Sequence, residues 1–444
     1  MSPAWGLPKE PDTVTELPPW RASPAHHRAV ALGALGAVVA VVLRRPDVLV
    51  LVTPFLVIAT WGQLARPERS GRVQARVGNL TLPEGQATTW TATLDLPPRA
   101  EEAFVRVSPG RFVRVDPLAD RTAVAAPGGV GVERVIPCRV VRWGRRRVGP
   151  GLVAARSPWW AFRTPVVELG AFRVTAVPAA AGFDATVSPH PVGLVGVNRS
   201  VRPGSGAEFA TIREFHPGDR LRRIHWPSSL RQGQLHVSTT YADQDAHVVL
   251  VVDAFSDLGP REGIDGRPTS LDLTVRACAS IAQHYLGSGD RVSLRVLGAQ
   301  DLPRLRTASG PGQHRRILDI LSRIEPATDR DRSTVRALEG VPSDSLVIVL
   351  SPLVHPAMSG VVAAASARGL TTVVIDTLPD HLVTAPTSRY DALAWRLRIL
   401  ERDEELHALR AAGVPIVTWG GPGSIDLVLR DVARRDRQPR LARR

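Results

Sequence analysis

The hydrophobic pattern near the start of the chain consists of two apolar runs, residues 29–43 and 48–65, on either side of a charged turn. Neither run carries a polar stripe at helical spacing, and a membrane-spanning helix needs about 20 residues. The first run reaches that length when flanking arginines extend toward the lipid headgroups. We therefore predict a transmembrane helical hairpin over residues 26–66, with two spans in the cell membrane. A pair of helices buried in a soluble core is the alternative.

Basic residues flank this hairpin unevenly. The turn between the runs holds Arg44 and Arg45, whereas the outer flanks carry Lys9, Arg21, Arg28, Arg66, Arg69, Arg72 and Arg76. Cytoplasmic segments of membrane proteins carry the excess of Lys and Arg. The pattern therefore predicts that both termini, and the soluble domains with them, are cytoplasmic.

The segments before and after the hairpin have different patterns. Residues 1–25 are polar and rich in Pro without periodicity, which predicts a disordered tail. Residues 70–180 carry short alternating runs, such as 88–94 and 111–115, broken by Pro and Gly. This alternation predicts an antiparallel β-sandwich domain.

The period of the pattern changes beyond residue 240. Residues 248–252 form a continuous apolar run that ends at Asp253. Further apolar strands are expected at residues 292–297, 345–350, 371–375 and 414–418, alternating with helices at 271–286, 313–324, 356–368 and 389–411. Strands apolar on both faces that alternate with helices predict a parallel, doubly wound α/β domain over residues 241–436. A basic tail follows at residues 437–444. One interpretation is that it lies along anionic lipid, and the alternative is that it is a frayed end that keeps the chain soluble.

Residues 181–240 hold a linker and then a dense block of turn-forming, basic and acidic residues. Its candidate site residues, which we call the junction motif, are Arg213, Glu214, Gly218, Asp219, Arg222, Trp226 and Arg231. We favour a structural role, in which Arg213 and Arg222 form ion pairs with Glu208, Glu214 and Asp219 between the domains. Trp226 is expected to be a core anchor. The alternative is a surface that binds an acidic partner or a phosphate, for which Arg220 and Arg223 are further candidates.

The junction motif resembles the signature of the family called domain of unknown function 58. That signature runs Arg-x-Tyr-x-x-Gly-Asp, then Arg-x-Ile-x-Trp, and then a Ser-Ala-Arg-like element. The matching residues are Arg213, Gly218, Asp219, Arg222, Ile224, Trp226 and Arg231. This chain departs from the signature at Phe215 in place of Tyr, at Pro227 in place of a basic residue and at Leu230 in place of Ala. The apolar hairpin, the Arg-rich β region and the α/β half extend the resemblance over nearly the whole chain.

The α/β half also resembles a von Willebrand factor A-like domain. In that family a metal-ion-dependent adhesion site begins Asp-x-Ser-x-Ser after the first strand, where this chain has Asp253, Ala254, Phe255, Ser256 and Asp257. The resemblance implies at most a degenerate site made of Asp253, Ser256 and Asp257. We expect no cofactor at this position, and Mg²⁺ is the alternative because it prefers oxygen ligands.

Composition and motifs limit the classes of function that the chain can have. The net charge of +14 comes almost entirely from Arg, since Lys9 is the single lysine, and it favours anionic partners such as a lipid surface over a specific nucleic acid. Cys138 and Cys278 are distant in sequence, so we expect two buried free thiols rather than a disulfide. The sequence contains no Gly-Lys-Ser/Thr phosphate loop, no His-Glu-x-x-His and no Gly-x-Ser-x-Gly.

These observations favour a membrane-anchored, non-enzymatic interaction or scaffold protein. The family resemblance implies a partner, a MoxR-type AAA+ ATPase, and a role in assembly or chaperone-like work. The alternative from a different class is a metal-dependent enzyme that uses the region around Asp253.

Overall fold

The fold was analysed in a computed structural model of the chain, which describes residues 13–117, 123–125, 131–180, 203–216, 224–241, 247–299, 302–326, 338–343, 345–380, 382 and 389–421. The chain divides into two compact units. The N-terminal unit comprises residues 1–177 and 262–265, and the C-terminal unit comprises residues 178–261 and 266–444. Each unit is described by itself.

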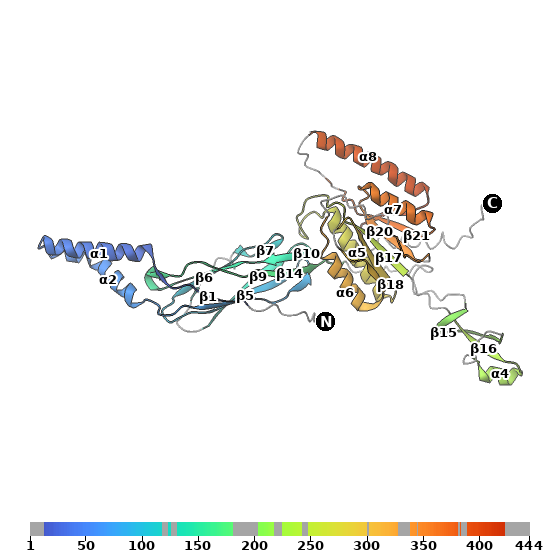
Figure 1. The fold of residues 1–444 in the computed structure, drawn as a ribbon, viewed down its shortest axis with the longest axis horizontal. Coiled ribbons are helices and arrows are strands. Elements are labelled where there is room, and N and C mark those ends of the chain that lie inside the picture. The colour runs from blue at the N-terminus through green and yellow to red at the C-terminus, as the bar shows by residue number, and fades with distance from the viewer. Residues whose placement is uncertain are drawn as a thin grey trace. The chain divides into compact units, whose positions relative to one another are not determined.

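The two predicted apolar helices are present as an antiparallel hairpin, α1 (Pro24–Val42) and α2 (Asp47–Leu64) (Figure 1). Ser23 caps α1, because its hydroxyl accepts a hydrogen bond from the His26 amide at 3.1 Å. The helices approach closely where α1 has glycine. A Cβ at Gly36 would lie 2.1 Å from Cγ1 of Val52, so only glycine permits this packing. Both helices are long and apolar enough to cross a membrane.

The N-terminal unit continues as sheets around one hydrophobic core, as the alternating pattern predicted. The first sheet has the order β1 (Thr13–Glu16), β3 (Arg72–Val77), β5 (Ala87–Asp95), β9 (Val132–Val140), β7 (Val113–Val115). The second has the order β2 (Arg21–Ala22), β12 (Phe162–Arg163), β11 (Gly151–Arg156), β6 (Glu102–Val107), β8 (Ala123–Ala125), with β13 (Val167–Leu169) beside β11. The third has the order β10 (Gly144–Val148), β14 (Phe172–Val177), β4 (Thr81–Pro83). Inward-facing residues of these sheets share a core around Trp90.

The prediction of disorder for residues 1–25 is wrong for residues 13–22. Strand β1 pairs with β3 and strand β2 pairs with β12. Leu17 and Trp20, 2% and 8% exposed, anchor this segment in the core, and Trp20 Nε1 donates to the Arg69 carbonyl at 3.0 Å. Two buried apolar side chains therefore order a segment whose composition is polar.

Segment Glu262–Asp265 belongs to the N-terminal unit although it is distant in sequence. The Asp265 carboxylate accepts two hydrogen bonds from Arg139, both at 2.8 Å, and one from Arg114 at 2.9 Å. The Ile264 amide donates to the Val141 carbonyl at 2.6 Å. A bidentate arginine pair is among the stronger polar contacts, so this segment has a defined position on the β core.

The C-terminal unit contains the predicted doubly wound sheet. Its order is β19 (Leu305–Ala308), β18 (Arg291–Leu297), β17 (His247–Asp253), β20 (Leu346–Ser351), β21 (Thr371–Asp376), β22 (Ile416–Thr418). All neighbours are parallel except the edge pair β18 and β19. Helices α5 (Ser270–Gly287) and α6 (Gly310–Leu321) cover one face, and α7 (Pro356–Ala367) and α8 (Arg389–Ala411) cover the other (Figure 1).

The described part of the junction forms a β-hairpin, β15 (Pro203–Glu214) with β16 (His236–Tyr241), and helix α4 (Trp226–Gln232). The expectation that Trp226 is a core anchor is wrong, because its side chain is 59% exposed. Trp226 is the first residue of α4, and this short helix buries Ser229 instead. His225 caps α4, with Nδ1 accepting from the Ser228 amide at 3.3 Å. Gly218, Asp219, Arg220, Arg222 and Arg223 lie outside the described residues.

Cys138 and Cys278 are free thiols buried in different units, which confirms the prediction. Burial raises the pKa of the Cys278 thiol far above its usual value, so this cysteine is unreactive in the folded chain.

Candidate functional site

The strand order of the C-terminal unit places a switch point between β17 and β20. From β17 the chain continues through α5 to β18 on one side, and β20, β21 and β22 extend the sheet on the other side. In open α/β sheets, ligands bind at the carboxyl ends of the strands where the order reverses. Asp253 ends β17 and Ser351 ends β20, so these two residues define the candidate site.

The Asp253 carboxylate is bonded to the protein's own donors. Ser351 Oγ donates to Oδ2 at 2.5 Å, and the Phe255 amide donates to Oδ1 at 2.9 Å. The Leu353 amide in turn donates to Ser351 Oγ at 2.8 Å. Asp253 is 1% exposed and Ser351 is fully buried. The position where a ligand would be expected is therefore occupied by an internal hydrogen-bonded chain.

Burial raises the pKa of Asp253 from its usual 3.8 to about 6, although the hydrogen bonds from Ser351 and Phe255 act in the opposite direction. Removal from water disfavours the charged form more than two neutral donors favour it. Perturbed carboxylates of this kind cluster at functional sites, but they also occur in structural networks. Chemically, Asp253 is a group that exchanges a proton near neutral pH.

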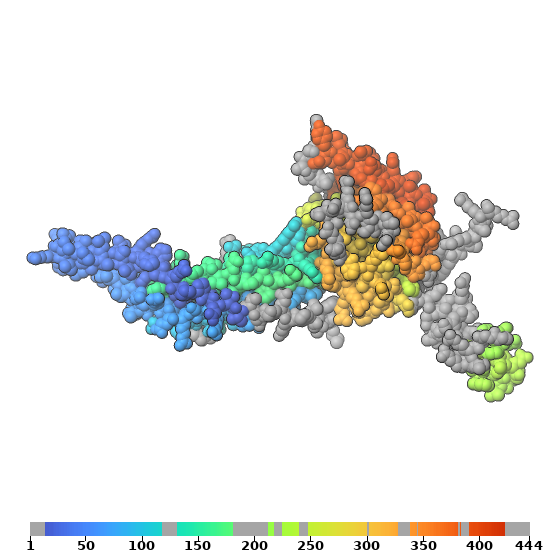
Figure 2. Space-filling view, in the orientation of Figure 1, coloured from blue at the N-terminus to red at the C-terminus, as the bar shows by residue number. Residues whose placement is uncertain are grey.

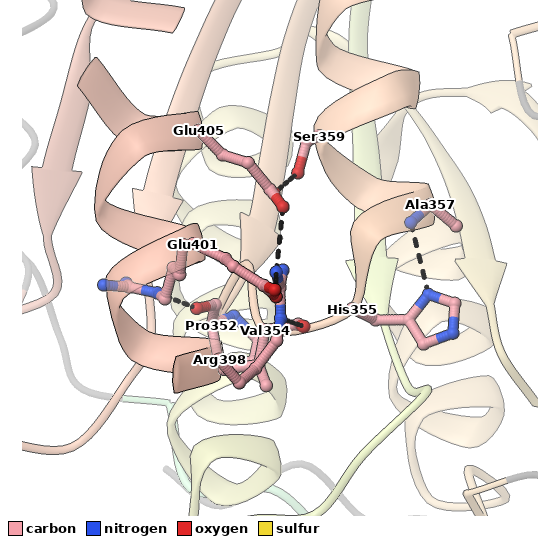
Figure 3. A network of polar contacts seen from close by, with 9 residues as sticks. Pro352, Val354, His355, Ala357, Ser359, Arg398, Glu401 and Glu405 are labelled. Carbon is pink, nitrogen blue, oxygen red and sulfur yellow. Dashed lines mark hydrogen bonds and ion pairs between the residues drawn. The ribbon is translucent and has the colours of Figure 1, made fainter. Parts of the chain in front are cut away.

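A stacked pair of rings covers the same edge of the sheet. Phe255 follows β17 and His355 precedes α7, and their ring centroids lie 4.1 Å apart with the planes 7° from parallel. A Cβ at Gly298 would lie 2.5 Å from the Phe255 amide nitrogen, so glycine at the end of β18 admits this close turn. His355 is held by capping α7, since its Nδ1 accepts from the Ala357 amide at 3.3 Å (Figure 3).

The three predicted metal-site residues do not form a donor set that suits Mg²⁺. Asp257 forms an ion pair with Arg261 at 2.8 Å, and Asp253 accepts the two bonds described above. Ser256 Oγ is buried without a hydrogen-bond partner among the described residues. Within those residues there is also no group of three or more His, Cys, Asp or Glu side chains placed to hold a metal. A hard cation that needs about six oxygen ligands has too few here.

The structure brings a polar network to the site that sequence analysis missed. Arg402 of α8 is 5% exposed and forms an ion pair with Asp376 at the end of β21. Its Nε donates to the Pro352 carbonyl at 2.7 Å, directly after β20. One buried guanidinium therefore connects α8 to the ends of two neighbouring strands.

Arg398 makes a second set of contacts one helical turn earlier (Figure 3). Its Nε donates to the Val354 carbonyl at 2.5 Å, and its Nη1 contacts Glu401 at 3.1 Å and Glu405 at 2.9 Å. Ser359 of α7 also donates to Glu405. Burial acts to raise the pKa of Glu405, but hydrogen bonds from Arg398 and Ser359 outweigh it and hold that pKa below its usual value. The sequence signal was the spacing of two acidic residues along the helix, Glu401 three and Glu405 seven positions after Arg398.

The described junction residues occupy the hairpin and α4. Arg213 and Glu214 end β15, and Arg213 Nη1 donates to the Glu214 carbonyl at 2.9 Å and lies 3.2 Å from His216 Nδ1. Arg231 lies in the last turn of α4. The predicted ion pairs of Arg222 and Asp219 fall outside the described residues, so that role stays a prediction.

Helix α8 also presents an exposed apolar face, which sequence analysis did not single out. Tyr390, Leu393, Leu397 and Leu400 are each more than half exposed. Their spacing places them on one side of the helix. The opposite side, with Leu406 and Leu409, is buried against the unit. Figure 2 shows α8, in red-orange, at the surface of the C-terminal unit.

Fold and site define an α/β unit with an internally bonded switch point, in a chain that also has an apolar helical hairpin. Residues 211–383 match the model of a family described as protein of unknown function DUF58. This match confirms the family resemblance. It covers the end of β15, α4, β16 and strands β17 to β21 of the α/β sheet.

Curated relatives extend the similarity without adding an activity. An uncharacterized protein of Mycobacterium bovis is 27% identical over 134 residues, which is 30% of this chain and 41% of the relative. Two uncharacterized proteins of Mycobacterium tuberculosis strains give the same values. The alignment therefore spans less than half the length of the relatives it matches.

Proposed function

We propose that this protein is a membrane-anchored, non-enzymatic interaction protein whose C-terminal unit docks a protein partner. By family resemblance, the partner is a MoxR-type AAA+ ATPase, and the shared work is assembly or chaperone-like remodelling. The excess of Arg outside the hairpin turn supports a cytoplasmic location of the soluble domains.

The outer surface of the hairpin is the main observation that supports membrane anchoring. Large apolar side chains point outward along both helices, and the more exposed ones are Leu35, Val38, Val41, Val42, Val50, Leu51, Trp61 and Leu64. The two threonines of α2 bond internally, Thr53 to the Leu49 carbonyl at 2.7 Å and Thr60 to the Leu56 carbonyl at 2.8 Å. An apolar surface of this extent with its hydroxyl groups satisfied suits lipid better than water.

Aromatic residues at the base of the hairpin support the same conclusion. The 3₁₀ turn η1 (Pro158–Trp160) contacts α2 and exposes Trp159 and Trp160, 63% and 58%. Both tryptophans have a left-handed backbone, with φ of 57°, and Arg156 lies 4.1 Å from the Trp160 ring centroid. Exposed Trp beside Arg is the composition of the membrane–water interface. A strained turn that presents two indoles is consistent with function rather than packing.

The state of Asp253 supports the non-enzymatic part. Its carboxylate and the Ser351 hydroxyl bond to each other, and the Phe255 and His355 rings stack over the same edge. A catalytic carboxylate needs access to a substrate within hydrogen-bond distance. A group that is 1% exposed lacks that access in this conformation.

The docking part rests on the apolar face of α8. An exposed set of one Tyr and three Leu side chains on a single helix face is typical of helix-mediated recognition. The buried Arg402 fixes α8 on the sheet, so the face is presented by a rigid element.

The proposal is tested by affinity purification of the full-length chain from detergent-solubilised membranes containing a MoxR-type ATPase of the same organism. Wild-type protein is expected to recover the ATPase, and a Leu393→Glu/Leu397→Glu variant to recover at least about tenfold less, because central apolar anchors dominate interface energy. Arg410→Glu changes an exposed position of the same helix away from the apolar face and serves as the control. Wild-type protein that recovers no such ATPase would contradict the partner assignment.

The second candidate function is a metal-dependent enzyme that uses the Asp253 region. The raised pKa of Asp253 favours it, whereas the donor set of Asp253, Ser256 and Asp257 described above speaks against it. It predicts calorimetric binding of Mg²⁺ that is lost in Asp253→Ala, together with turnover of a substrate. Equal heats for wild type and variant would exclude Asp253 as a metal ligand.

A further inference from the structure

A pocket of about 460 Å³ lies in the N-terminal unit where the hairpin meets the β core. Its lining includes His26, His27, Val30, Gln63, Arg66 and Phe162. The lining residues come from the start of α1, the end of α2 and two strands of the β core. The pocket is therefore built from elements that are distant in sequence.

The lining has a polar part that suits an anion. Arg66, His27 and Gln63 are exposed and supply donors, and none of the described lining residues carries a carboxylate. The Arg66 guanidinium lies 5.5 Å from the ring centroid of Phe162, and the described residues give it no carboxylate partner. A guanidinium that is positioned by an aromatic face but not neutralised favours a phosphate or carboxylate ligand.

His26 forms the wall beneath these donors. His26 is 6% exposed, and its ring centroid lies 5.2 Å from the ring centroid of Phe162. Nδ1 has no hydrogen-bond partner among the described residues. A Cβ at Gly62 would lie 2.9 Å from this nitrogen, so the His26 ring packs against α2 and closes the pocket on that side.

The rest of the lining is apolar and continues along α1. Val30, Ala31 and Ala34 are exposed on the part of the helix that enters the predicted membrane span. One end of the pocket therefore offers hydrogen-bond donors, among them the Arg66 guanidinium, and the other offers a surface for hydrocarbon. A ligand that matches both ends has a phosphate group joined to an acyl chain.

We propose that this pocket binds an anionic phospholipid, with its phosphate at Arg66, His27 and Gln63 and an acyl chain along Val30 and Ala34. This inference rests on the proposed membrane anchoring of the hairpin. It adds a specific lipid site to that anchor, at the depth where Trp159 and Trp160 mark the interface. Free phosphate would contact the same donors as a lipid phosphate, but it has no acyl chain to contact Val30 and Ala34.

The test is native mass spectrometry of the full-length protein in detergent micelles, titrated with dioleoyl phosphatidylglycerol or dioleoyl phosphatidylcholine. Wild type is expected to retain phosphatidylglycerol at lower lipid concentrations than phosphatidylcholine. Arg66→Gln is expected to raise the half-saturating concentration about tenfold, the value of one hydrogen bond to a charged group. The control Arg72→Gln removes the same charge at an exposed position outside the pocket and is expected to leave it unchanged.

A further arm adds soluble glycerol 3-phosphate as competitor. Poor displacement by glycerol 3-phosphate supports the lipid, whereas displacement at equal concentration would show that the headgroup alone suffices and would overturn the lipid assignment. Equal retention by wild type, Arg66→Gln and Arg72→Gln would overturn the site. In that case the protein would still purify with membranes, so the lipid site would fail while the anchor stands. A protein found without detergent in the soluble fraction would instead remove the anchor itself.

Discussion

Ser351 Oγ donates a hydrogen bond of 2.5 Å to Asp253 Oδ2 across the boundary between β20 and β17. The two residues are 98 positions apart and stand at the point where ligands enter most sheets of this class. In this chain the two side chains bond to each other, and both are buried.

Asp253→Asn is expected to change the pH dependence of stability. The pKa of Asp253 is about 6 in the folded chain and near its usual 3.8 when unfolded. The folded state therefore holds a proton that the unfolded state has released between these values. The stabilising contribution is present below about pH 4 and is lost as the pH rises through about 6. Wild type should lose on the order of 3 kcal/mol relative to Asp253→Asn over this range.

The free energy of unfolding is measured by urea titration of the full-length chain in detergent. Unfolding is detected as labelling of the Cys278 thiol. This cysteine is buried in α5, and mass spectrometry of its peptide separates it from Cys138. Parallel pH profiles for wild type and Asp253→Asn would show that the carboxyl group titrates normally.

Ser351→Ala is expected to destabilise the C-terminal unit by about 1–3 kcal/mol, because the buried carboxylate and the Leu353 amide both lose a partner. The loss should be larger at high pH, where Asp253 is charged. Ser345→Ala is the matched control, since Ser345 is a buried serine directly before the same strand. Its hydroxyl has no partner among the described residues, so its removal should cost little. Equal losses in the two variants, measured with Cys278, would contradict a specific role for Ser351.

Arg402→Met is expected to lower the free energy of unfolding by about 3–5 kcal/mol, because it leaves the partly buried Asp376 carboxylate without its cation. Arg323→Met is the control, because it removes the exposed ion pair between Arg323 and Asp319 at the end of α6. It should lower the free energy of unfolding by less than about 1 kcal/mol. Amide hydrogen exchange of peptides from α8 should also increase in Arg402→Met. Unchanged exchange in α8 would show that Arg402 does not hold this helix on the sheet.

The sequence predicted the order of elements well where periodicity was strong. The continuous apolar run at residues 248–252 became β17, and the alternation of apolar strands with helices became the doubly wound sheet. Strands β1 and β2 were missed because their order comes from pairing with distant strands and from the burial of Leu17 and Trp20. Local composition carries no record of such contacts.

The candidate site was predicted in part. Asp253 was identified from its position at the end of a strand, whereas Ser351, Asp376 and Arg402 were not assigned partners. Their contacts join segments that lie 26 to 98 residues apart, so no local motif reports them. Trp226 was assigned to the core from its hydrophobicity, yet a short helix with one buried face left it exposed.

The central claim is that the α1–α2 hairpin anchors the chain in a bilayer. The most direct test separates lysate carrying the full-length chain into soluble, carbonate-washed membrane and detergent-extracted fractions. The account predicts that the protein stays with washed membranes and is released by detergent. It also predicts that a variant lacking residues 24–64 becomes soluble. Full-length protein in the soluble fraction without detergent would contradict it.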